Sequence, residues 1–160
     1  MTGIYYADLF EINNKGCLVM GCGKTKTCRH YTGNDTVMIC NDSIRLEKVN
    51  NELFGYADPA MGMGLKPFDK NKAKSTKIEY LIRMLSEEET KEMKCTKITT
   101  ISKDEYAELS DFNITFRCEN VQARRHEFRF LVDGVDLTCI IVPWCDDMDT
   151  KGALIGNFVH

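Results

Sequence analysis

The sequence predicts an α+β fold with a mainly antiparallel sheet, built from an N-terminal β-meander and a C-terminal hairpin. Short apolar runs separated by turn sequences fill the first fifty residues, and strict apolar/polar alternation returns after residue 110. One long, broken helix and one short helix are expected between them. A chain of 160 residues suits a single domain. The alternative is a division into a meander (1–50), a loop or linker (51–75) and an α+β part (76–160).

The N-terminal meander is predicted from apolar runs that end at turn sequences. Asn13-Asn14-Lys15-Gly16 is a turn sequence of this kind. The run from Cys17 to Cys22 after it is apolar enough for a strand that is buried on both faces. We expect strands over residues 4–12, 17–22, 27–32, 36–40 and 44–47, with Gly33-Asn34-Asp35 as a hairpin loop.

The middle of the chain changes from loop to helix. Residues 50–75 combine glycine, proline, methionine and lysine without a clear period, which predicts a long loop. Residues 76–94 are predicted to be helical, because apolar residues follow one another at the spacing of one helix face. These residues are Ile78, Leu81, Ile82 and Leu85.

Two capping boxes place helix starts within this region. Ser86 is followed three residues later by Glu89, so the long helix is expected to break and restart at Ser86. Ser102 and Glu105 repeat the pattern, which predicts a short helix that ends near Leu109.

The C-terminal strands are predicted from alternation. Apolar and polar residues alternate over 112–118 and again on both sides of Asp133-Gly134. Asp-Gly between two alternating segments is typical of a tight hairpin, so residues 128–132 and 135–141 are expected to pair. The remaining residues, 143–160, are expected to form a tail.

Charge and composition exclude several classes of protein. The net charge of −3 argues against nucleic acid as the main partner, because nucleic-acid binders need a basic surface. No apolar run reaches the roughly 18 residues that a membrane-spanning helix needs. The N-terminus lacks the basic and apolar segments of a secretory signal, which predicts a cytoplasmic protein with free cysteines.

A metal site is the first candidate chemistry. The ligand types fit zinc, but the closest cysteines are separated by four residues, and on a strand Cys17 and Cys22 would point to opposite faces. Packed free thiols are therefore preferred, and no cofactor is expected. A zinc-stabilised domain or metalloenzyme remains the alternative, with candidate ligands Cys17, Cys22, Cys28, His30 and Cys40.

A phosphate site is the second candidate. Gly21-Cys22-Gly23-Lys24-Thr25 matches the end of a phosphate loop, but Leu18 stands where the first glycine of that motif belongs. Since the following residues are also predicted as strand, the sequence argues against a nucleotide triphosphatase. What remains is a small anionic ligand, such as a nucleotide, held by basic residues of two turns. These residues are Lys24, Lys26, Arg29, His30, Arg124, Arg125 and His126.

No intact catalytic constellation is visible, so the first hypothesis is a binding protein and not an enzyme. It is a small accessory or inhibitor protein, of the type found in phages and other mobile elements, that docks to a protein partner. Met61, Met63 and Trp144 are the predicted partner contacts, because methionine adapts to apolar surfaces and tryptophan is enriched in interface hot spots. The predicted contact segments are 22–33, 55–68 and 124–126. The anion binder and the zinc protein are the second and third hypotheses.

Overall fold

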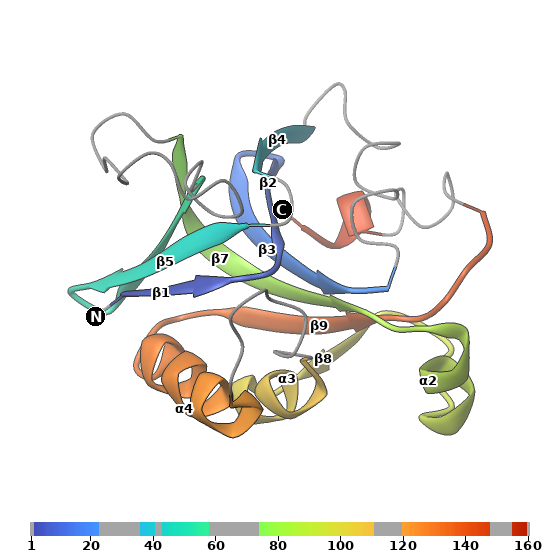
Figure 1. The fold of residues 1–160 in the computed structure, drawn as a ribbon. Helices are drawn as coiled ribbons and strands as arrows, with labels where there is room; N and C mark the ends of the chain where they lie inside the picture. The colour runs from blue at the N-terminus through green and yellow to red at the C-terminus, as the bar shows by residue number, and fades with distance from the viewer. Residues whose placement is uncertain are drawn as a thin grey trace.

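The computed structural model describes residues 2–22, 36–40, 43–57, 74–110, 120–147 and 155–159. Within these ranges nine strands form one curled sheet with helices beside it (Figure 1). The strands are β1 (Thr2–Tyr5), β2 (Asp8–Ile12), β3 (Lys15–Gly21), β4 (Thr36–Cys40), β5 (Ile44–Val49), β6 (Glu52–Ala57), β7 (Ser75–Met84), β8 (Thr99–Ile101) and β9 (Thr138–Val142). The helices are α2 (Glu87–Glu92), α3 (Lys103–Leu109) and α4 (Val121–Val132), and a helical turn spans 155–158.

The sheet is mixed, and its longest strand, β7, lies at its centre. β3 pairs with β7 in parallel along one side. On the other side, the first half of β7 pairs with β6 in antiparallel fashion, and the second half pairs with β9 in parallel. The α+β class is confirmed, but the expected mainly antiparallel sheet is corrected, because the central strand β7 pairs in parallel with both β3 and β9. The outer ladders, β1–β5, β5–β6, β2–β3, β2–β4 and β8–β9, are antiparallel.

The helix predicted over 76–94 is wrong for its first half, which is β7. Leu81 belongs to one apolar cluster and Ile82 to another, so consecutive residues of β7 are buried on opposite faces of the sheet. A strand buried on both faces has no period of two, and its apolar run can imitate a helix face. The predicted restart is confirmed: Ser86 caps α2 in a capping box with Glu89.

The hairpin predicted around Asp133-Gly134 is also wrong, because the residues before this pair form α4. Asn120 caps the helix by accepting a hydrogen bond from the backbone N–H of Ala123. Gly134 has a φ of +75° just past the C-cap Asp133, the left-handed conformation that often ends a helix. Phe128 is buried whereas Phe130 is 58% exposed, so the alternation that suggested a strand does not follow burial.

The predicted N-terminal meander is wrong, because β1 pairs with β5, and β4 pairs with β2 and not with its chain neighbour β3. The strand expected over 4–12 is divided into β1 and β2. Two more local predictions are confirmed. Asn13 and Asn14 both have positive φ and form the tight turn between β2 and β3. Residues 16–20 of β3 are buried, as the apolar run predicts, whereas Gly21 and Cys22 at the end of the predicted run are exposed. The loop expected over 50–75 is interrupted by β6, and the predictions for 27–32, 33–35 and 112–118 lie outside the described residues.

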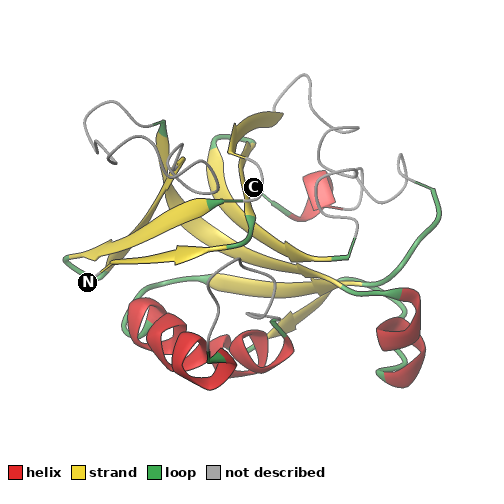
Figure 2. Cartoon of the chain, in the orientation of Figure 1, coloured by secondary structure: helices red, strands yellow, loops and turns green. Residues whose placement is uncertain are grey.

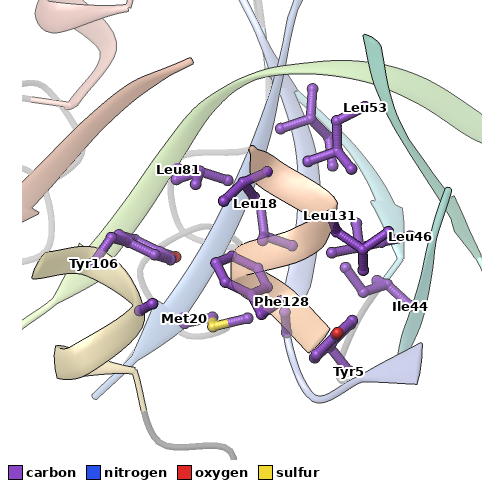
Figure 3. Close-up of a cluster of buried hydrophobic side chains, with 14 of the residues drawn as sticks. Tyr5, Leu18, Met20, Ile44, Leu46, Leu53, Leu81, Tyr106, Phe128 and Leu131 are labelled. Carbon is purple, nitrogen blue, oxygen red and sulfur yellow. The ribbon is translucent and has the colours of Figure 1, made fainter. Parts of the chain in front are cut away.

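Two apolar clusters cover the two faces of the sheet. The first lies between the sheet and the α3–α4 pair (Figure 2). In it, Phe128 stacks on Tyr106 and meets Tyr5 edge-on (Figure 3). The second lies on the opposite face and is completed by Ile155 and Val159. No helix in the described ranges is both long and apolar enough to cross a bilayer.

Candidate functional site

Three parallel strands end at one edge of the sheet. β3, β7 and β9 run in the same direction and finish at Gly21, Met84 and Val142. We call their ends and the residues that follow them, 21–22, 84–86 and 142–144, the carboxyl edge. In open α/β sheets, ligands bind outside the carboxyl ends of parallel strands, which makes this edge the candidate site.

Backbone hydrogen bonds hold the three strand ends together. The N–H of Cys22 donates to the carbonyl of Met84 at 3.0 Å, and the N–H of Leu85 donates to the carbonyl of Val142 at 2.9 Å. The chain therefore leaves β3, β7 and β9 from adjacent, fixed positions. A ligand at the carboxyl edge would therefore contact backbone groups that the pairing of the three strands holds in place.

Gly21 makes the turn at the end of β3. Its φ is +110°, and a Cβ at this position would lie 2.2 Å from the carbonyl oxygen of Met84. Only glycine fits such a position without strain. Leu18, in contrast, is completely buried inside β3, so the strand continues past the position where a phosphate-loop motif has its first glycine. The turn thus begins at Gly21, while residues 23–25 lie outside the described ranges.

Arg83 lies directly beside this turn and is only 6% exposed. A Cβ on Gly21 would be 2.8 Å from its Nη1 atom. Nη1 donates to the carbonyl of Met84 at 2.6 Å, and Nε donates to the carbonyl of Leu109 at 3.1 Å. Nη2 pairs with a carboxylate oxygen of Glu89 at 2.9 Å. One guanidinium therefore joins the ends of β7 and α3 to α2 beneath the carboxyl edge.

Glu89 serves both Arg83 and the start of α2. Its Oε1 accepts a hydrogen bond from the backbone N–H of Ser86 at 2.9 Å, while the Ser86 hydroxyl accepts one from the N–H of Glu89 at 3.1 Å. Burial acts to raise the pKa of Glu89, but the N–H of Ser86 and the Arg83 guanidinium outweigh it and hold the pKa below its usual value. The carboxylate is thus ionised at neutral pH. Neither residue of this pair was predicted as part of a site, although a lone arginine within the apolar run 81–85 is a visible signal.

The second predicted basic cluster lies on α4, where its two arginines form hydrogen bonds with backbone carbonyls of other elements of the chain. Arg124 donates to the carbonyl of Ile4 at 2.7 Å and lies over the ring of Tyr5. Arg125 donates to the carbonyl of Ala107 at 2.9 Å. These contacts tie α4 to β1 and α3, whereas His126 is exposed.

The first basic cluster lies outside the described residues. The structure therefore does not test the proximity of this cluster, Lys24, Lys26, Arg29 and His30, to the cluster on α4. The ligand-binding role of the two clusters together stays a prediction.

The cysteines of the zinc hypothesis do not gather in the part of the chain that the structure describes. Cys17 packs in the second apolar cluster, Cys40 packs against the first, and Cys22 is exposed at the carboxyl edge. Among the described residues, no three side chains of metal-binding type come together. Cys28 and His30 lie outside these ranges, so the zinc hypothesis stays a prediction.

Burial should make the cysteines differ in reactivity. It raises the pKa of Cys17 to about 12 and that of Cys139 to about 11, and the thiolate is the form that reacts. At pH 8 we expect iodoacetamide to modify exposed Cys22 in the folded protein and to spare Cys17 and Cys139. Peptide mass spectrometry measures this, with urea-unfolded protein as the control in which all three react. Equal modification of Cys17 and Cys22 in the folded protein would contradict the prediction.

Comparison with known proteins identifies the fold. No protein-family model matches the chain, and no curated protein sequence does. Among solved structures, the HPr(Ser) kinase/phosphatase from Coxiella burnetii matches with a TM-score of 0.58 and 16% sequence identity. The match covers 98% of this chain and 95% of that one. The chain shares the fold of a kinase/phosphatase.

This match overturns the first hypothesis, a non-enzymatic accessory or inhibitor protein of phage type. The fold is one that an enzyme uses, and nothing in the comparisons supports a phage accessory protein. Of the residues predicted to contact a partner, Met61 and Met63 lie outside the described ranges. Trp144 is half-buried, and it lies at the carboxyl edge.

Proposed function

We propose that this protein binds the phosphates of a nucleotide at the carboxyl edge and uses them in phosphoryl transfer. One observation carries the proposal: the segment Gly21-Cys22-Gly23-Lys24-Thr25 begins at the last residue of β3, where this strand ends beside its parallel neighbour β7. A strand followed by Gly-Lys-Thr is the setting in which phosphate loops occur. The likeness to a structure named as a kinase/phosphatase supports the same chemistry.

The proposal revises the sequence-based argument against a phosphate loop. That argument rested on two grounds. The first was Leu18, which is a core residue of β3, and the chain turns at Gly21 instead. The second was the strand predicted over 27–32, which lies outside the described residues. In a phosphate loop, backbone N–H groups surround the phosphates and the lysine neutralises their charge. Lys24 holds that position here, since it follows Gly23 in the motif. Phosphoryl transfer depends mainly on such positioning and charge stabilisation, so this segment is where the activity should be most sensitive.

Substitution of Lys24 tests the proposal. We expect the wild type to bind ATP and tripolyphosphate in the presence of Mg²⁺, and Lys24→Ala to weaken both by about 10- to 100-fold, the range for a lost charge-assisted hydrogen bond. The matched control is Lys15→Ala, at the end of β3 that lies away from the carboxyl edge. Within the described ranges, Lys15 forms a partly exposed ion pair with Glu79, so its loss should leave affinity unchanged. Isothermal titration calorimetry measures all three proteins.

Two results would contradict the proposed function. The first is a wild type that binds neither ATP nor tripolyphosphate, and the second is an equal loss of affinity in the Lys15 and Lys24 variants. If binding is found, release of ADP from ATP, with and without Mg²⁺, then tests whether the bound nucleotide is a phosphoryl donor.

A further inference from the structure

Trp144 is the only tryptophan of the chain and lies at the carboxyl edge, two residues after β9. Its backbone N–H donates to the Thr90 hydroxyl at 2.8 Å, and that hydroxyl donates to the carbonyl of Ser86 at 2.8 Å. Both bonds are independent of the indole ring. The backbone position of Trp144 is therefore fixed against α2, and a change of its side chain leaves these bonds intact.

Trp144 and the glycine turn stand on opposite sides of the end of β7. β3 and β9 are the two neighbours of the second half of β7, and neighbouring strands are about 4.8 Å apart. The strand that ends at Gly21 and the strand that leads to Trp144 are thus about 10 Å apart. A nucleotide carries its base at one end and its phosphates at the other, with the ribose between, so it can extend along an edge of this width.

The two sides of the edge offer complementary chemistry. The β3 side has a glycine turn followed by Lys24, which suits phosphate, while the β9 side has a half-buried aromatic ring, which suits a flat base. We infer that Trp144 provides the surface on which the base of the nucleotide stacks. The inference rests on the proposed function and narrows its ligand to a nucleoside phosphate, as opposed to a phosphate group alone.

Because no second tryptophan is present, intrinsic fluorescence reports on Trp144 directly. We expect ATP to quench the emission, and tripolyphosphate to bind without quenching it, because only ATP carries a base. Trp144→Leu should weaken ATP binding by about 5- to 150-fold, the range for loss of one base–aromatic stack, and leave tripolyphosphate affinity unchanged. Trp144→Phe keeps an aromatic face and should retain most of the affinity for ATP. Phe130→Leu, which changes an exposed aromatic residue of α4, is the matched control and should bind like the wild type.

The outcomes separate this inference from the proposed function. Tripolyphosphate that binds as tightly as ATP, together with a Trp144→Leu variant that binds ATP like the wild type, would overturn the inference and leave the proposed function standing. A wild type that binds neither ligand would defeat the proposed function itself. Thermal melting shows whether each variant is folded. If the Trp144→Leu variant is unfolded, the inference is tested by the fluorescence quenching of the wild type and by the ATP affinity of Trp144→Phe. ATP binding to the wild type without quenching would then overturn the inference.

Discussion

Replacing Glu89 with alanine is expected to lower the free energy of unfolding by about 3 kcal/mol. In this variant the guanidinium of Arg83, which is nearly buried, loses its counter-charge. The substitution also removes one half of the α2 capping box. Breaking a buried ion pair from one side costs about 3–5 kcal/mol, and the lower end applies because Glu89 itself is partly exposed. Urea unfolding at pH 7 measures the loss.

The matched control is Glu87→Ala, in the same helix turn. Among the residues that the structure describes, Glu87 pairs with exposed Lys91, so its removal should cost less than about 0.5 kcal/mol. The double variant Arg83→Met with Glu89→Ala should recover part of the loss, since no unpaired buried charge remains. Equal destabilisation by the Glu87 and Glu89 variants would show that the Arg83 pair does not support the edge.

The same pair sets a pH dependence with a definite sign. The pKa of Glu89 is lower in the folded protein than its usual value of 4.5, so the unfolded chain binds its proton first as the pH falls. The stabilisation is therefore complete above about pH 4.5 and is lost as the pH falls through the folded-state pKa. Accordingly, the difference in stability between the wild type and Glu89→Ala should shrink in acid.

Substituting Gly21 with alanine is expected to weaken ATP binding by at least about tenfold and to lower the free energy of unfolding by about 1–3 kcal/mol. The new Cβ would be placed 2.2 Å from the backbone oxygen of Met84, at a φ that side chains rarely adopt. Because the atom that the new Cβ would strike belongs to the backbone, the turn at Gly21 must move to make room for it. The phosphate loop that we propose would move with the turn. Calorimetric titration with ATP and urea unfolding measure the two effects.

Gly134→Ala is the matched control for this variant. Gly134 also has a positive φ, but the nearest atoms to a Cβ there belong to the side chains of Asn51, at 3.3 Å, and Lys48, at 4.0 Å, and the position lies at the end of α4. We expect a cost in stability of about 1 kcal/mol and no change in ATP affinity. If Gly21→Ala lost stability but bound ATP like the wild type, the phosphate loop would not begin at Gly21.

Features with short-range causes were predictable from the sequence. The capping boxes at Ser86 and Ser102 and the turn at Asn13-Asn14 each satisfy backbone groups within three or four residues. Such patterns carry their full explanation in the local sequence. Their positions agree with the structure even where the element before them, β7, was assigned to the wrong type.

Features that depend on distant partners were not predictable in this way. The pattern Ile78, Leu81, Ile82 and Leu85 fits a helix as well as a doubly buried strand, and only the neighbours β3 and β9 decide between them. Gly134 poses the same ambiguity, since a hairpin turn and a helix end both accept glycine at positive φ. Neither choice can be made from spacing alone.

The candidate site shows the same division. The glycines and Lys24 of the phosphate-loop segment are visible in the sequence, but a spacing rule that requires glycine at position 18 argues against them. Their relevance follows from the end of β3 beside β7, which is a property of the sheet. Arg83 was missed because its acceptors, the carbonyls of Met84 and Leu109, come from two different elements.

The central position of β7 has a consequence for how the protein folds. Its parallel partners, β3 and β9, come from the beginning and the end of the chain, so the carboxyl edge forms only after long loops have closed. Pairings of high contact order fold slowly, and no short fragment contains all three strand ends. A ligand bound across this edge would therefore stabilise the protein against global unfolding. During refolding, recovery of ligand binding should be among the last signals to appear.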